Sequence, residues 1–160
     1  HARNRYKQYT GLLLPQPTVI TGEGQKLLLD EVLGDGFTLI TYCATVQESS
    51  QLHTLMHDDA WFGVRAVGLH TSKPQSDVLT DADETHIRHV YLTEDMPEQP
   101  FPLLLRHPRL CLLVRPDRHI FGLFDIGNAS NVVITLKKML NDRSEIGYFV
   151  DPRFIDGVGP

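Results

Sequence analysis

Two cysteines in 160 residues are too few for the disulfide framework of a small secreted protein. Long apolar runs are also absent: the longest is Leu110–Val114, whereas a membrane-spanning helix needs about 20 such residues. The N-terminus is polar and basic, with no apolar stretch of signal-peptide length. These absences predict a cytoplasmic protein with reduced thiols and no membrane partner.

Positive charge is scarce as well. The chain has 15 Lys and Arg against 20 Asp and Glu, which gives a formal net charge of −5. Without a basic cluster, nucleic acid is not an expected partner. Apolar residues at 41% and charged residues at 22% are ordinary for a globular domain, which argues against disorder. Because the chain begins with His1, we expect it to be a processed product or an excerpt of a longer protein.

The first half of the chain alternates between two hydrophobic periods. Residues 37–43 and 64–71 are rich in β-branched, aromatic and alternating apolar residues, which predicts strands. Apolar residues at helical spacing predict helices over 25–33 and from Ser49 or Ser50 to about residue 62. A strand, a helix and a second strand in this order form a βαβ unit.

The second half has the clearest tertiary signal. Residues 110–114 are apolar on both faces, as in a central strand covered by helices. A turn over 115–118 and a strand over 119–124 complete a β-hairpin, and a helix over 130–141 follows. Further predictions are an acidic loop over 77–84, a strand over 87–92, a proline-rich loop over 94–102 and at most one helical turn over 103–106.

This order of elements is that of a thioredoxin-like α/β sandwich, with a mixed central sheet, a β-hairpin and flanking helices. Residues 1–18 are interpreted as an irregular lead-in, because Pro15 and Pro17 prevent a helix. Residues 19–145 form the thioredoxin-like domain, and residues 146–160 form an irregular C-terminal tail.

Four short blocks resemble a known family. They are Gly11–Pro17, Leu28–Gly34, Gly36–Ile40 and Leu113–Gly122, and the last contains Leu-Val-Arg-Pro-Asp. Together, in this order, they resemble the C-terminal region of FAD-dependent aromatic-ring hydroxylases, with 3-(3-hydroxyphenyl)propionate hydroxylase as the nearest member. Phenol hydroxylase and polyketide hydroxylases are similar but more distant. The resemblance covers roughly residues 11–140.

The resemblance implies a thioredoxin-like module without catalytic residues of its own. The parent enzymes of the family insert one oxygen atom from O₂ into a phenolic ring, using FAD and NAD(P)H, and their FAD sites lie upstream. It therefore implies FAD and NAD(P)H as cofactors of a full-length parent, with none in this chain. The implied partners are the FAD and substrate domains of the same polypeptide, with a homodimer as a further contact.

The residues themselves give no cofactor site. Gly22-Glu23-Gly24 and Gly34-Asp35-Gly36 each lack the third glycine of a dinucleotide fingerprint, so both are predicted to be turns. In the family motif, Arg115, Pro116, Asp117 and Gly122 are predicted to be structural. Pro116 presets the turn, Asp117 accepts hydrogen bonds from turn amides, and Arg115 closes the strand end.

Cys43 is the one residue with a redox interpretation. In a thioredoxin-like fold, redox cysteines sit at the end of the first long strand, where the following helix N-terminus lowers a thiol pKa. The residues after Cys43 are Ala-Thr-Val, so the resolving cysteine is absent, but Pro108 stands where such proteins keep a cis-proline. The alternative is a small buried hydrophobic residue. Cys111, in mid-strand, is predicted to be core.

The eight histidines offer two spacings of interest. His53 and His57 are four residues apart on the predicted helix and could share a metal ion, but no third ligand is evident. A solvated helix face is the favoured interpretation. His86 and His89, on a strand, would point to opposite faces. The sequence therefore predicts no metal site.

We conclude from the sequence that this is a non-catalytic structural or interaction domain of an FAD-dependent aromatic hydroxylase. The main alternative is a stand-alone thioredoxin-fold thiol redox protein that uses Cys43. A third hypothesis is a non-enzymatic interaction module with other partners.

Overall fold

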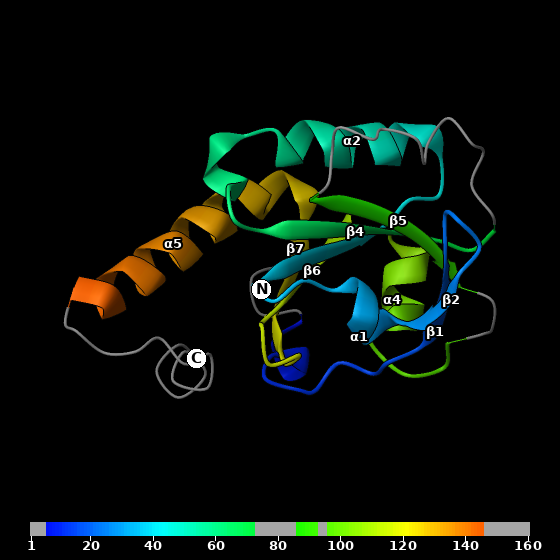
Figure 1. The fold of residues 1–160 in the computed structure, drawn as a ribbon. Helices are drawn as coiled ribbons and strands as arrows, with labels where there is room; N and C mark the ends of the chain where they lie inside the picture. The colour runs from blue at the N-terminus through cyan, green and yellow to red at the C-terminus, as the bar shows by residue number, and fades with distance from the viewer. Residues whose placement is uncertain (1–5, 73–85, 93–95, 146–160) are drawn as a thin grey trace.

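The computed structural model describes residues 6–72, 86–92 and 96–145. Their centre is a seven-stranded mixed sheet in the order β2-β1-β5-β4-β3-β6-β7. Helices α2 and α5 lie on one side of the sheet, and helices α1 and α4 lie on the other (Figure 1). Among the described residues, no helix combines the length and the apolar character needed to cross a membrane.

Three parallel strands form the middle of the sheet. Strand β3 (Thr38–Tyr42) is followed by helix α2 (Val46–Met56) and then by β4 (Arg65–His70), which pairs with β3 in parallel. Strand β5 (Ile87–Leu92) continues the parallel arrangement on the other side of β4. The predicted βαβ unit and the strand over 87–92 are therefore confirmed.

Antiparallel strands complete both edges. On one side, β6 (Leu110–Val114) pairs with β3 and forms a hairpin with β7 (Ile120–Asp125), as predicted. On the other side, β1 (Thr18–Thr21) pairs with β5 and with β2 (Lys26–Leu28).

The sheet separates two hydrophobic cores. One lies under α1 (Leu29–Val32) and α4 (Phe101–Arg106) and includes Leu29, Leu104 and the even-numbered residues of β6. The other lies under α2 and α5 (Ala129–Glu145) and includes Leu52, Trp61 and Val133. Because side chains alternate along a strand, odd and even residues of the central strands serve different cores.

The predicted helix over 25–33 is wrong in its first half. Residues 26–28 form β2, because a turn at Gly24 (φ 88°) folds them back onto β1. Only Leu29–Val32 is helical. The apolar spacing in this short segment fits both a strand and a helix, so pairing with β1 decides between them.

The helix predicted from Ser49 or Ser50 begins earlier. Its first residue is Val46, because the Thr45 backbone N–H and hydroxyl both donate to the Glu48 carboxylate, at 3.1 and 2.6 Å. It ends at Met56, and Asp58 accepts the Ala60 N–H to start a separate 3₁₀ turn, Asp59–Trp61.

The remaining elements differ less from the predictions. Helix α4 begins at Phe101, and α5 begins at Ala129. The inner face of α5 is formed by Ala129, Val133 and Leu136, whereas Val132, Met139 and Leu140 are only partly buried. The acidic loop predicted over 77–84 and the tail over 146–160 lie outside the described residues.

Candidate functional site

Neighbouring strands place three donor side chains on one face of the sheet. In the register of β4 and β5, His89 lies opposite Gly68, and His70 follows Gly68 by two residues, on the same face. In the register of β3 and β4, Thr41 lies opposite Gly68. Cys43 follows Thr41 by two residues, and its N–H donates to the Leu69 carbonyl at 2.8 Å. The three side chains therefore all project toward α2.

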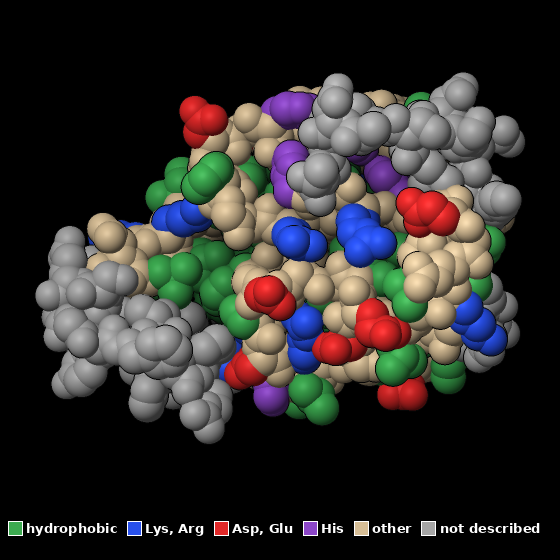
Figure 2. Space-filling view, viewed as in Figure 1, with side chains coloured by type: hydrophobic (Ala, Val, Ile, Leu, Met, Phe, Trp, Pro, Cys, Tyr) green, Lys and Arg blue, Asp and Glu red, His purple; other side chains and the backbone are tan. Residues whose placement is uncertain are grey.

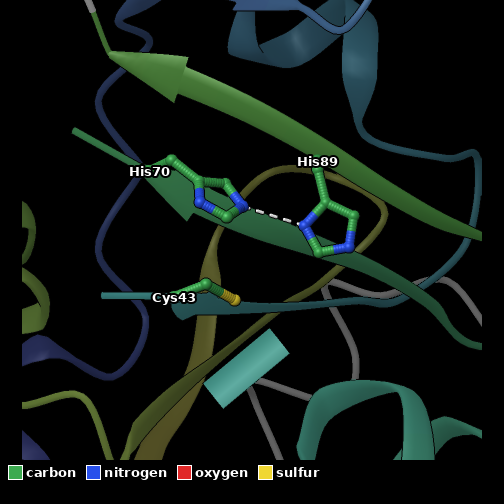
Figure 3. Close-up of side chains that lie close together, drawn as sticks. All are labelled: Cys43, His70 and His89. Atoms are coloured by element: carbon green, nitrogen blue, oxygen red, sulfur yellow. Dashed lines mark hydrogen bonds between the residues drawn. The ribbon is translucent and has the colours of Figure 1, made fainter. Parts of the chain in front are cut away.

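The donor atoms of this cluster converge (Figure 3). One ligand atom each from Cys43, His70 and His89 lies within 4.8 Å of the other two. The two imidazoles are directly hydrogen-bonded, with His70 Nε2 at 2.9 Å from His89 Nδ1. The exposed fractions of Cys43, His70 and His89 are 3%, 8% and 9%. We call these three residues the Cys-His-His cluster.

Gly68 leaves the space in which the cluster meets. A Cβ on Gly68 would lie 2.7 Å from His89 Nδ1 and 3.1 Å from Cys43 Sγ. The glycine is thus required by the close approach of these two side chains to the backbone. Any larger residue would separate the thiol from the imidazole.

Helix α2 adds a fourth donor. His53 Nε2 lies 2.9 Å from His89 Nε2, and the two rings are stacked at an angle of 8°. His57, one turn later, is exposed, and its Nδ1 lies 2.7 Å from the His53 carbonyl oxygen. The two histidines whose spacing suggested a shared ion therefore do not converge: His53 faces the sheet. Figure 2 shows histidine side chains gathering on the side of the molecule that carries α2.

Burial keeps the cluster uncharged at neutral pH. It lowers the pKa of His70 and of His89 to about 4, and the neighbouring His70 and His53 contribute further at His89. Burial also raises the pKa of the Cys43 thiol to about 11, against a smaller opposing effect of the Ser49 hydroxyl. At pH 7 the cluster therefore presents a thiol and two neutral imidazoles.

The three imidazoles form a directional chain. A neutral imidazole has one donor nitrogen and one acceptor nitrogen. Since both nitrogens of His89 are hydrogen-bonded, one must donate and the other accept. A proton shift at one end of the chain, at His53 or His70, therefore changes the tautomer of His89.

The surroundings of Cys43 differ from those of a nucleophilic cysteine. The thiol is buried and protonated, whereas a nucleophilic cysteine is partly exposed and ionised. Pro108 stands two residues before β6, but its peptide bond is not cis; the cis peptide bond among the described residues is Gln99–Pro100. Cys111 is fully buried, as predicted, with its pKa raised to about 12 by burial.

The residues of the family motif occupy the β6–β7 hairpin. Asp117 Oδ1 accepts the His119 N–H at 3.2 Å and its other carboxylate oxygen pairs with the Arg115 guanidinium, which is fully buried. Pro116 lies in the turn, and Gly122 on β7 has open space where a Cβ would stand. These contacts are those of a structural turn.

Sequence reasoning missed the Cys-His-His cluster because it compared histidines only with near neighbours in the chain. His89 was weighed against His86, although its contacts are to His70 and His53. A signal was nevertheless available. Cys43 and His70 each lie at the end of a predicted strand of the βαβ unit, and the ends of parallel strands meet at one edge of a sheet.

Comparisons with solved structures show a thioredoxin-like fold. The thioredoxin domain of a thiol-disulfide oxidoreductase from Bacteroides vulgatus is 19% identical, with a TM-score of 0.56 over 79% of this chain and 96% of that chain. A yeast mitochondrial 1-Cys peroxiredoxin is 14% identical, with a TM-score of 0.57 over 84% and 78%. A peroxiredoxin-like protein from Aquifex aeolicus is 11% identical, with a TM-score of 0.55 over 79% and 86%.

Comparison of the sequence with curated proteins gives no match. A family model does match: the HcaD C-terminal domain, over residues 11–139. This range contains all seven strands of the sheet, the Cys-His-His cluster and most of α5. The chain therefore belongs to the HcaD C-terminal domain family.

Proposed function

We propose that this domain is the non-catalytic C-terminal domain of an FAD-dependent hydroxylase that acts on a phenolic aromatic substrate. Its partners are the FAD and substrate domains of the same polypeptide, against which it packs. FAD and NAD(P)H are cofactors of that full-length enzyme, which consumes O₂. The family match over residues 11–139 and the four sequence blocks that resemble such hydroxylases support this proposal.

The observation that carries the non-catalytic role is the state of Cys43. Its side chain is 3% exposed and its pKa is raised to about 11, so the residue best placed for thioredoxin-like chemistry is not a thiolate at neutral pH. The second cysteine, Cys111, is also buried. A domain with this fold and without a reactive thiol is suited to packing.

Flavin binding by the isolated chain is the first test. An FAD site needs backbone amides at a helix N-terminus for the pyrophosphate, and the Gly22–Gly24 segment instead forms the turn between β1 and β2. We expect the purified 160-residue chain to be colourless and to leave flavin fluorescence unchanged when FAD is added at micromolar concentration. Saturable quenching with a one-to-one endpoint would contradict the proposal.

The parent polypeptide is the second test. We expect the gene to encode, upstream of residue 1, a strand-turn-helix unit with a Gly-x-Gly-x-x-Gly fingerprint. The purified full-length protein should be yellow and should oxidise NADPH or NADH faster when a phenol is present. An upstream region without a nucleotide-binding unit would refute the hydroxylase assignment.

A second candidate function is that of a stand-alone thiol redox protein. The position of Cys43 between β3 and α2, in a fold shared with a 1-Cys peroxiredoxin, favours it. The test is reduction of hydrogen peroxide or of a small disulfide by the isolated chain. We expect no turnover. Activity that is lost in Cys43→Ser and kept in Cys111→Ser would replace the packing proposal with this one.

A further inference from the structure

We propose that Cys43, His70 and His89 form a binding site for a thiophilic transition-metal cation, Zn²⁺ or Cu⁺. His70 and His89 come from the adjacent parallel strands β4 and β5, Cys43 directly follows the neighbouring strand β3, and all three side chains project from one face of the sheet. One donor atom of each lies within 4.8 Å of the other two. The site is separate from any flavin chemistry, and its test is a binding measurement that is independent of hydroxylase activity.

The donor set determines the class of metal. One sulfur and two imidazole nitrogens suit Zn²⁺ and Cu⁺, whereas Mg²⁺ and Ca²⁺ require oxygen ligands. A zinc site with three protein ligands keeps its fourth position open for water or another ligand. The Cys-His-His cluster has this composition.

The distance between the two imidazole nitrogens is close to that of a bound site. With metal–nitrogen bonds of about 2.1 Å, two nitrogen ligands of a tetrahedral ion stand about 3.4 Å apart. His70 Nε2 and His89 Nδ1 are now 2.9 Å apart and share a hydrogen bond. The two nitrogens need to separate by about half an ångström, which side-chain rotation supplies.

His53 would fix the ligand tautomer of His89. When Nδ1 of His89 binds the ion, its Nε2 carries the proton, and His53 Nε2 lies 2.9 Å away to accept it. A ligating imidazole nearly always donates its second N–H to a hydrogen-bond acceptor, and the unprotonated nitrogen of His53 would serve as one here. The contact from α2 therefore orients His89 for binding through the nitrogen that faces His70 and Gly68.

Gly68 gives independent support for the geometry. A Cβ at this position would lie 2.7 Å from His89 Nδ1 and 3.1 Å from Cys43 Sγ, so two of the donor atoms border the space that glycine leaves. The Ser49 hydroxyl, 4% exposed and near the thiol, has no other hydrogen-bond partner among the described residues. It can stabilise the thiolate that a bound metal requires.

Metal binding at the Cys-His-His cluster releases one proton. Binding removes the Cys43 thiol proton, and Cys43–SH plus the cation gives a metal–sulfur bond and one proton in solution. The proton shared by His70 and His89 stays on the rings, because it moves to the outer nitrogen of the imidazole that carries it. We therefore expect release of about one proton per metal ion at pH 7.

The experiment titrates Co²⁺, Zn²⁺ and, without oxygen, Cu⁺ into the purified chain. Co²⁺ should produce a thiolate-to-cobalt charge-transfer band that saturates at one equivalent, and Zn²⁺ should displace it. Calorimetry of Zn²⁺ binding in buffers of different ionisation enthalpy counts the released proton. Competition with a chromogenic chelator tests Cu⁺. If only one of the two ions, Zn²⁺ or Cu⁺, binds saturably to the chain, that ion is identified as the ligand of the site.

Matched variants distinguish this site from adventitious binding. Cys43→Ala should abolish the charge-transfer band, whereas Cys111→Ala, which removes the other buried thiol, should keep it. His53→Gln should weaken Zn²⁺ binding about 10- to 100-fold, whereas His57→Gln on the same helix should not. Gly68→Ala should also abolish the band, and Gly122→Ala, where a Cβ meets open space, is its control.

Two results would overturn the proposal. One is a folded wild-type chain that shows no charge-transfer band and no saturable binding of Zn²⁺ or Cu⁺. The other is metal binding that persists unchanged in Cys43→Ala. If Cys43→Ala fails to fold by circular dichroism, the pair Gly68→Ala and Gly122→Ala, which keep all ligands, decides instead. Equal metal binding by these two folded variants would count against the site.

Discussion

His70 Nε2 lies 2.9 Å from His89 Nδ1, across the boundary between two parallel strands, and both rings are about nine-tenths buried. The second nitrogen of His89 is hydrogen-bonded to His53, so the network accommodates neutral rings. Protonation of either ring therefore competes with the fold.

The first prediction follows for stability against pH in the metal-free protein. The pKa of each of His70 and His89 is lowered from 6.5 to about 4 by burial. Between pH 6.5 and 4 the unfolded chain binds more protons than the folded chain, so the free energy of unfolding falls as the pH falls through this window. Above pH 7, where both rings are neutral in the folded and the unfolded chain, these two groups do not make the free energy of unfolding depend on pH.

Urea denaturation at pH 7 and pH 5, with a chelator present, measures this effect. We expect the free energy of unfolding to be lower at pH 5 than at pH 7 by an amount on the order of 2–4 kcal/mol, because two groups are shifted and one pKa unit corresponds to about 1.4 kcal/mol. A free energy of unfolding that is equal at the two pH values would contradict the prediction.

The second prediction concerns the packing at Gly68. Gly68→Ala should lower the free energy of unfolding by about 1–3 kcal/mol, because the new Cβ would overlap the His89 ring. Gly122→Ala on β7 should change it little, since no atom lies within 4 Å of the added carbon. Thermal melts of the two variants measure the difference, and equal melting temperatures would mean that the ring moves aside freely.

The third prediction concerns the β6–β7 hairpin. Asp117→Ala removes the acceptor of the His119 N–H. The loss of this hydrogen bond should lower the free energy of unfolding by about 1 kcal/mol. The substitution also removes the carboxylate partner of the fully buried Arg115, and the loss of one partner of a buried ion pair costs about 3–5 kcal/mol.

Chemical denaturation of Asp117→Ala should therefore show a decrease in the free energy of unfolding that is larger than the value of about 1 kcal/mol for the hydrogen bond alone. Asp35→Ala, at an exposed position in the loop before β3, is the control and should be near neutral. A loss of 1 kcal/mol or less for Asp117→Ala would show that Arg115 is held by its other contacts.

The fourth prediction concerns thiol reactivity. In the native metal-free chain, both cysteines should react slowly with a thiol reagent at pH 8, since both are buried and burial raises their pKa values to about 11 and 12. In denaturant both should react at once. Rapid labelling of one thiol in the native chain, mapped to Cys43 by its absence in Cys43→Ser, would reopen the redox interpretation.

Local composition was enough to predict the central strands. Residues 110–114 are apolar on both faces and form a fully buried strand, and residues 87–92 form a strand with the predicted bounds. The segment 25–33 was predicted incorrectly, because a three-residue strand is stabilised by its partner β1 and not by its own pattern.

From residue 37 onward, the amino-acid sequence by itself determined the order of the central strands and helices, their apolar faces and the turn chemistry, since these depend on neighbours within a few residues. The Cys-His-His cluster was decided only by the tertiary structure. Residues 43, 70 and 89 meet because β3, β4 and β5 pair in a particular parallel register, and a shift of one residue would move a side chain to the other face. The pKa values of the cluster are likewise set by the burial that this pairing and helix α2 create.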